Sequence, residues 1–216
     1  MRLIDLTVPI HTGMPVYPGD PEVSLEPALR VETDGVNVLR VHFGSQTGTH
    51  VDAPAHLGDE LPALDELPLE HFTGPAVVVD ARSVPPRGAI GPEYFDLPWG
   101  PGTIVLIATG WSAHWGSEKY HTHPHLPPAA AEALVAAGIR TIGIDAPSID
   151  PPDDLTLPAH RILCTAHAVI AENLTGLDQV LAAQRAGESI EVSLFPLPLT
   201  GADGAPVRAV ARVGKR

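Results

Sequence analysis

Two short runs in this sequence are apolar at almost every position, Ala76 to Asp80 and Thr103 to Thr109. Strands with one face in water show apolar residues at every second position, whereas strands covered on both faces are apolar throughout. These runs therefore predict strands in the covered middle of a sheet. Pro127 to Ala137 instead predicts a helix, because it is rich in alanine, begins with proline and is followed by Gly138.

This helix leads directly into a third β-rich run, Thr141 to Asp145. A helix that feeds a buried strand indicates an α/β unit, and ligands usually gather beyond the carboxyl end of such a strand. Three further runs are also β-rich, namely Leu3 to Ile10, Val36 to Phe43 and Ile190 to Phe195. In Val36 to Phe43 the apolar residues alternate with more polar ones, as in a half-exposed strand. We therefore expect an α/β fold with a mixed sheet.

The length of 216 residues, with 44% hydrophobic residues, is sufficient for one sizeable core and predicts a single domain over residues 1–216. The 24 prolines and 20 glycines are scattered between the apolar runs, which is typical of turns and not of a disordered block.

The formal net charge of −13 comes from carboxylates along the whole chain, and no basic stripe is present that could neutralise a phosphate backbone. We therefore expect a small-molecule substrate and not nucleic acid. No apolar run approaches the length of a bilayer span, and Asp5 interrupts the apolar amino-terminal stretch, so we expect neither membrane insertion nor export. Cys164 is the only cysteine, which excludes an intrachain disulfide and fits a reducing cytoplasm.

Site chemistry is concentrated between Gln46 and His56, where His50, Asp52 and His56 fall within eleven residues. Because Pro54 disfavours a helix here, we expect the three side chains to converge through a tight loop. Imidazole and carboxylate groups together suit zinc, manganese or iron at catalytic sites, which keep a position open for water. The alternative is that these polar groups only cap backbone amides in a loop.

A second cluster runs from His160 to Glu172, an otherwise apolar stretch that has a histidine at one end and a glutamate at the other. A carboxylate at the end of an apolar run is costly unless it is paired or bound to metal, so Glu172 is a candidate ligand, even a bridging one. A structural ion pair is the alternative. The loop histidines His114, His121, His123 and His125 are expected to be exposed, with lining of a substrate entrance as the alternative role. Asp145, Ser148 and Asp150 are expected mainly to shape the turn that follows the predicted strand.

Taken together, these residues resemble the cyclase superfamily, which includes bacterial kynurenine formamidase and isatin hydrolase and has the signature His-x-Gly-Thr-His-x-Asp-x-Pro-x-His. The resemblance extends along the whole chain. Beyond the signature, it rests on Asp5-Leu6-Thr7, on residues 13–20 (GMPVYPGD), on residues 143–150 (GIDAPSID), and on the spacing from His160 to Glu172-Asn173-Leu174.

The resemblance implies a swivelling β/β/α domain that assembles as a homodimer or homotetramer and binds one or two divalent ions, zinc or manganese. It implies metal ligands at His50, Asp52, His160 and Glu172, and it assigns His56 as the general acid/base. It also places Tyr17 where formamidases carry an aromatic residue, usually tryptophan, that packs on the substrate.

One position departs from the signature, because Gln46 stands where the first histidine would be. A glutamine oxygen is a weaker, neutral ligand, so Gln46 is a doubtful member of the metal site and a one-ion enzyme is an alternative. The replacement of tryptophan by Tyr17 likewise weakens the case for N-formylkynurenine as the substrate.

The functional hypothesis is a metal-dependent hydrolase that cleaves an amide, formamide or lactam C–N bond with an activated water, similar to the arylformamidases of tryptophan catabolism. One alternative is a metal-dependent cyclase or dehydratase in a biosynthetic pathway. A catalytically silent binder of small molecules is the other, although such a protein would have no need of an unligated base at His56.

Overall fold

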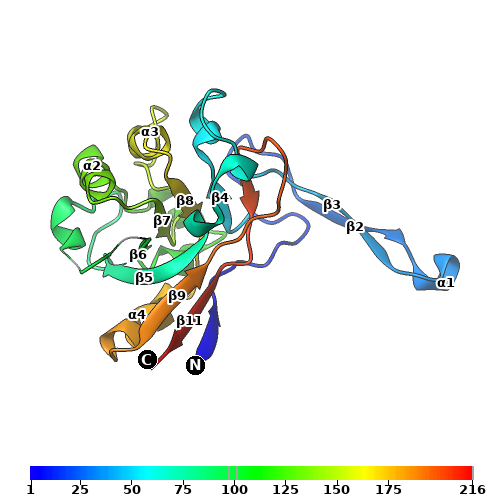
Figure 1. The fold of residues 1–216 in the computed structure, drawn as a ribbon. Coiled ribbons are helices and arrows are strands. Elements are labelled where there is room, and N and C mark those ends of the chain that lie inside the picture. Colours follow the sequence, from blue (N-terminus) through cyan, green and yellow to red (C-terminus); the bar gives the residue numbers. More distant parts are fainter. Residues whose placement is uncertain (97, 101, 216) are drawn as a thin grey trace.

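The computed structural model describes residues 1–96, 98–100 and 102–215. Within them, nine strands form one sheet in the order β1-β11-β9-β5-β6-β7-β8-β4-β10 (Figure 1). Neighbours from β5 to β8 are parallel, and the pairs on either side of this group are antiparallel, so the predicted mixed sheet is confirmed. The strands are β1 Arg2–Asp5, β4 His50–Asp52, β5 Thr73–Asp80, β6 Ile104–Ala108, β7 Thr141–Ile144, β8 Val169–Glu172, β9 Ser189–Ser193, β10 Gly204–Pro206 and β11 Val210–Gly214.

Helices cover both faces of the central strands, as the continuous apolar runs predict. Helices α2 (Pro128–Ala136) and α3 (Pro158–Thr165) lie on one face, and α4 (Leu177–Arg185) lies on the other (Figure 1). Side chains of β6 alternate between two cores: Val105 and Ile107 pack with α2 and α3, whereas Ile104 and Leu106 pack with α4. The predicted α/β class is therefore confirmed, and the predicted helix Pro127 to Ala137 corresponds to α2.

One predicted strand lies outside the main sheet. Val36 to Phe43 contains β3 (Val38–His42), which pairs with β2 (Ser24–Leu29) in a separate two-stranded sheet, with α1 (Val31–Asp34) at its tip. This hairpin, which we call the arm, projects away from the body (Figure 1). All five residues of β3 are exposed. The alternation indicated a strand correctly, but neither face of that strand meets a core within this chain.

Short elements account for most of what the sequence did not indicate. The predicted run Leu3 to Ile10 contains only the last three residues of the four-residue strand β1, and no strand was expected at β2, β4, β8, β10 or β11. The 3₁₀ helices are η1 Pro54–Leu57, η2 Leu64–Glu66, η3 Leu69–His71, η4 Pro92–Phe95, η5 Trp111–His114 and η6 Glu118–Thr122. Among the helices of the described residues, none is long and apolar enough to cross a membrane.

Candidate metal centre and active site

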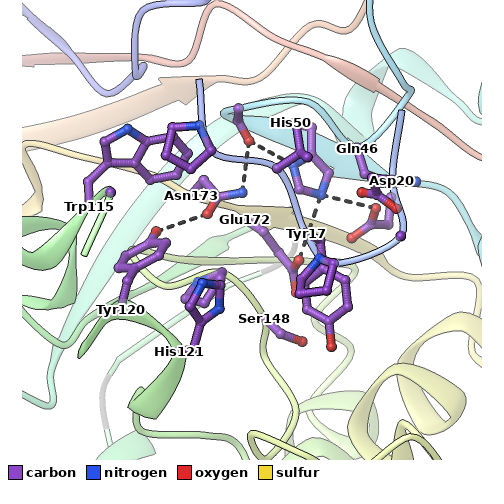
Figure 2. Close-up of a pocket in the computed structure, with 18 of the residues that line it drawn as sticks. Tyr17, Asp20, Gln46, His50, Trp115, Tyr120, His121, Ser148, Glu172 and Asn173 are labelled. Carbon is purple, nitrogen blue, oxygen red and sulfur yellow. Dashed lines mark hydrogen bonds and ion pairs between the residues drawn. The ribbon is translucent and has the colours of Figure 1, made fainter. Parts of the chain in front are cut away.

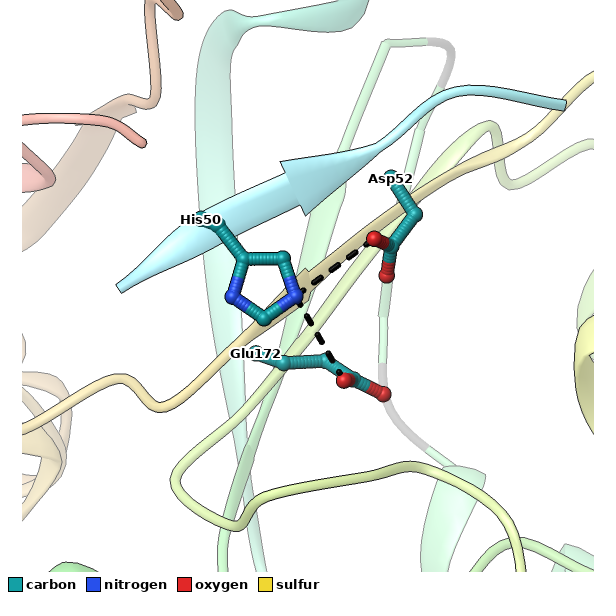
Figure 3. Close-up of side chains that lie close together, drawn as sticks. All are labelled: His50, Asp52 and Glu172. Atoms are coloured by element: carbon teal, nitrogen blue, oxygen red, sulfur yellow. Dashed lines mark ion pairs between the residues drawn. The ribbon is translucent and has the colours of Figure 1, made fainter. Parts of the chain in front are cut away.

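The first cluster is built on strand β4 and not on a loop. Because side chains alternate along a strand, His50 and Asp52 project from the same face of β4. β4 pairs antiparallel with β8, and the register places Glu172 directly opposite His50. Figure 3 shows the three side chains pointing toward one another. The expected tight loop is therefore wrong for His50 and Asp52, whereas a turn does follow: Pro54 begins η1, which carries His56.

His160 reaches the same place from the first turn of α3. Its Nε2 lies 3.7 Å from Asp52 Oδ2 and 3.5 Å from Glu172 Oε1. On the other side of the group, His50 Nε2 lies 3.4 Å from Asp52 Oδ1 and 3.7 Å from Glu172 Oε2. All four side chains are buried. The structure thus brings together the four predicted ligands, and His50, Asp52 and Glu172 by themselves have the geometry of a metal-binding group.

The chemistry of this group fits a divalent cation. Both carboxylate oxygens of Asp52 are buried and have no hydrogen-bond partner among the described residues. A buried carboxylate without donors is strongly unfavourable unless a cation is bound nearby. Ligands about 2.1 Å from a tetrahedral ion would lie about 3.4 Å apart, which is close to the nitrogen–oxygen separations in the group. The four side chains can therefore hold a divalent cation.

Hydrogen bonds at the far side of each imidazole leave Nε2 free to bind metal. His50 Nδ1 donates to the carbonyl oxygen of Gly48 at 2.8 Å, and His160 Nδ1 donates to Asp150 Oδ2 at 2.5 Å. Asp150 also accepts from the backbone N–H groups of Ala159 and His160. Such partners fix the tautomer and the orientation of ligating histidines. Asp150, expected mainly to shape a turn, is thus the residue that orients His160.

Asn173 and Tyr120 complete the support of the group, and no separate feature of the sequence indicated their roles. Asn173 Nδ2 donates to the carbonyl oxygen of Gly48 at 2.9 Å, the same oxygen that accepts from His50. Asn173 Oδ1 accepts from the hydroxyl of Tyr120 at 2.9 Å. The backbone of Asn173 has a φ of 55°, which asparagine tolerates better than most residues. This network links the metal group to Tyr120, the buried residue of η6.

The charges of the group compensate one another when no ion is bound. Burial lowers the pKa of His50, but the carboxylates of Asp52 and Glu172 outweigh it and raise the pKa to about 9. At His160, burial again lowers the pKa, but the neighbouring carboxylates outweigh it and raise the pKa to about 10. Burial raises the pKa of Glu172 to about 7, whereas the neighbouring histidines outweigh burial at Asp52 and hold its pKa well below the usual range. A bound cation would take over the role of the imidazole protons.

A cavity of about 590 Å³ opens onto this group, within the size range of about 300–1,000 Å³ that is typical of ligand sites. Tyr17, predicted to contact the substrate, is 45% exposed and lies at the cavity wall, as do Trp115 and His121 (Figure 2). His121 is exposed as predicted, and it also lines the entrance. His123, however, is buried, and its Nδ1 donates to the carbonyl oxygen of Pro124 at 3.0 Å, so the prediction of exposure is wrong there.

His56 and Gln46 lie beside the metal group and contact a residue that the sequence did not indicate, Asp203. His56 Nδ1 lies 3.2 Å from Asp203 Oδ2, and Gln46 Nε2 donates to the same oxygen at 2.9 Å. His56 lines the cavity, and its ring centroid is 5.9 Å from that of His160. The predicted general acid/base is therefore next to the ligands and open to the cavity.

Comparison with known proteins agrees with this geometry. A family described as "Putative cyclase" matches residues 4–151. A kynurenine formamidase of Salinibacter ruber is 35% identical over 215 residues, which cover 98% of each chain, and a kynurenine formamidase of Bacillus cereus is 36% identical over 211 residues, covering 97% of this chain and 96% of the relative.

Solved structures give the same result. Isatin hydrolase A from Labrenzia aggregata, bound to benzyl benzoate, has a TM-score of 0.84 at 24% identity, covering 100% of this chain and 94% of that one; this likeness concerns the fold. A predicted metal-dependent hydrolase from Bacillus stearothermophilus has a TM-score of 0.76 at 28% identity and covers 97% of both chains.

Proposed function

Because this chain belongs to the cyclase family, we propose that it is a metal-dependent hydrolase that cleaves the C–N bond of an amide, formamide or lactam. The observation that carries this proposal is the buried group of His50, Asp52, His160 and Glu172, in which neither oxygen of Asp52 has a hydrogen-bond partner among the described residues. The group lies at the base of a cavity, next to an imidazole that does not belong to it.

The four side chains would hold one zinc or manganese ion per subunit. When bound, such an ion lowers the pKa of a water molecule and polarises a carbonyl group. His56 supplies the proton transfers: its Nδ1 side faces Asp203, so Nε2 is available to the cavity, where it accepts a proton from water and returns it to the leaving nitrogen. We propose one ion because the nitrogen–oxygen distances among the four side chains, 3.4 to 3.7 Å, surround a single position.

The cavity wall supports a neutral or zwitterionic aromatic substrate. Tyr17 and Trp115 offer aromatic surfaces for an aryl ring. Asp20 and Glu118 add negative charge, and no lysine or arginine is among the described residues that line the cavity. N-formylkynurenine and other aryl formamides meet these requirements, and isatin is the lactam to compare with them.

The test is release of formate from aryl formamides and opening of the isatin ring by metal-loaded protein. His56→Asn should abolish turnover and leave metal content nearly unchanged. The matched control is His167→Asn, which changes an exposed histidine whose positive φ of 57° suits asparagine. Normal turnover in His56→Asn would contradict the assigned role, and wild-type protein that hydrolyses none of these substrates would contradict the proposed activity.

We also propose a homodimer, or a tetramer of two such dimers, formed through the arm. An isolated two-stranded hairpin is at best marginally stable in water. The arm nevertheless exposes a set of apolar side chains, each between 39% and 57% accessible: Leu29, Val31, Val36, Val38, Leu39 and Val41. A second copy of the chain would cover them. Light scattering should therefore give a dimer or tetramer for wild type.

The matched variants for this assembly are Leu39→Glu and Leu69→Glu. Leu39 is 56% exposed on the arm, and Leu69 is 67% exposed on the body. Only Leu39→Glu should dissociate the assembly, and a wild-type monomer would contradict the proposal.

The single cysteine, Cys164, is buried, and we propose a reducing cytoplasmic location with residues 1–216 acting as one domain.

A further inference from the structure

Asp203 stands behind His56, on the side away from the cavity. Its Oδ2 lies 3.2 Å from His56 Nδ1 and 2.9 Å from Gln46 Nε2, and the two nitrogens are 3.2 Å apart. Asp203 is not among the residues that line the cavity. The three side chains thus form a compact cluster in which His56 and Gln46 line the cavity and Asp203 does not.

Backbone hydrogen bonds to Ala53, the residue that follows Asp52, connect the segments that carry Asp203 and His56. Ala53 N–H donates to the carbonyl oxygen of Asp203 at 2.8 Å, and His56 N–H donates to the carbonyl oxygen of Ala53 at 3.0 Å. Directly after Asp203, β10 pairs with β4 so that Gly204 lies opposite Asp52. The distance between the Asp203 carboxylate and the imidazole is therefore set by the same strand that carries two of the proposed metal ligands.

We propose that Asp203 is a positioning residue for His56, and that Gln46 holds Asp203 in place instead of binding metal. This inference rests on the proposed hydrolase function. The carboxylate accepts the Nδ1 hydrogen of His56, which leaves the lone pair of Nε2 for the cavity. When Nε2 accepts a proton from water, the carboxylate stabilises the imidazolium without taking the proton itself.

The charge state of Asp203 suits this role. Burial raises the pKa of its carboxyl group, but hydrogen bonds from Ser45, Gln46 and His56 outweigh burial and hold the pKa below its usual value. Asp203 is therefore ionised at neutral pH, where an ionised carboxylate is a stronger acceptor than a neutral group.

The orientation of the Gln46 amide follows from the same carboxylate. If its oxygen faced Asp203, two acceptors would oppose each other, so Nε2 must be the atom that faces Asp203. The amide also lies against Gly204, where a Cβ would approach Nε2 to 2.9 Å. Gln46, which stands at the position of the first signature histidine, thus donates the hydrogen bond that holds Asp203 beside His56.

The test compares Asp203→Asn with Asp65→Asn. Asp65 is the matched control because its carboxylate accepts from Gly201 N–H at 2.9 Å and so supports the same loop without contacting His56. In ¹⁵N NMR of zinc-loaded protein, with the His56 signals assigned from their loss in His56→Asn, wild type and Asp65→Asn should show hydrogen on Nδ1 and a bare Nε2. Asp203→Asn should lose this tautomer.

Kinetics provide the second measurement. In Asp203→Asn, kcat should fall by about 100-fold or more, the range of general acid–base catalysis, with KM and metal content unchanged. Retention of the Nδ1–H tautomer together with near-normal kcat would overturn the positioning role. The NMR measurement needs no substrate. A wild-type protein without hydrolase activity would therefore contradict the proposed function, while the NMR spectra would still show whether Asp203 sets the tautomer of His56.

Gln46→Ala keeps the inference testable if Asp203→Asn does not fold. Loss of one neutral hydrogen bond to Asp203 should reduce kcat by about fivefold. The metal content should stay at one ion per chain. A variant that loses its metal, or a wild-type protein that binds a second ion lost on this substitution, would show that Gln46 is a ligand and would overturn its assignment to Asp203.

Discussion

The substitution Asp150→Asn tests whether His160 is held in place as a metal ligand. The Asp150 carboxylate is 1% exposed and accepts three hydrogen bonds, from Ala159 N–H at 2.6 Å, from His160 N–H at 3.1 Å and from His160 Nδ1 at 2.5 Å. The asparagine oxygen can keep the two contacts with His160, but its amide group then faces Ala159 N–H, donor against donor. The imidazole keeps a neutral acceptor in place of a charged one.

The expected effect follows from this loss of charge. A hydrogen bond to a charged group contributes about 1.5–3 kcal/mol and a neutral one about 0.5–1.5 kcal/mol, so the orientation of His160 is weakened by about 1–1.5 kcal/mol. Because about 1.4 kcal/mol corresponds to a factor of ten, the Kd for zinc should rise about tenfold. This is at the lower end of the range found when partners of ligating histidines are changed.

The assay is competition for zinc against a chromophoric chelator at fixed pH. Asp145→Asn is the matched control: Asp145 is also buried and accepts three hydrogen bonds, from the backbone and hydroxyl of Thr109 and from Gly110 N–H, but it contacts none of the proposed ligands. Both variants should lose stability, and only Asp150→Asn should lose affinity. An unchanged Kd in Asp150→Asn, or an equal change in both variants, would contradict the role assigned to Asp150.

Three further outcomes are expected. In metal-free protein the pKa values of His50 and His160 are raised to about 9 and about 10, so both rings are protonated at pH 7. Zinc binding should therefore release protons, and its affinity should increase as pH rises toward 9. Calorimetry in buffers of different ionisation enthalpy would detect the released protons. Tyr17→Ala should raise KM for an aryl formamide by up to about tenfold, whereas Tyr17→Phe should change it little, because the ring provides the contact; equal KM values in all three proteins would exclude that contact. Since Asn173 has a positive φ, Asn173→Ala should be less stable to denaturant than Asn173→Gly by about 1 kcal/mol, and the reverse order would contradict the backbone argument.

The parts of the fold that the sequence predicts are those with a continuous local pattern. Strands β5, β6 and β7 and helix α2 are apolar over several consecutive residues, and each lies where its pattern indicates. Strand β4 has only three residues, two of them polar, so its sequence resembles a loop. The arm shows the opposite case, since its alternation is that of a half-buried strand but all five residues of β3 are exposed.

Some residues of the candidate site can likewise be predicted from the sequence and others cannot. His50, Asp52 and His56 are recognisable because they belong to a signature with characteristic spacing, and the proposed ligands His160 and Glu172 because they flank an apolar stretch later in the chain. Their supporting residues are not, because support depends on contacts between distant parts of the chain: Asn173 lies 125 positions from Gly48, and Asp203 lies 147 positions from His56. Only the pairing of β4 with β8 and β10 brings these partners together.

The central claim is that His50, Asp52, His160 and Glu172 hold one divalent ion that hydrolysis requires. The most direct measurement is to strip the protein with a chelator and add zinc or manganese back in small steps, following bound metal and aryl formamide hydrolysis together. If these side chains hold the required ion, activity is lost on stripping and reaches its maximum at one ion per chain. Full activity in metal-free protein, or no binding of either ion by a folded chain, would contradict it.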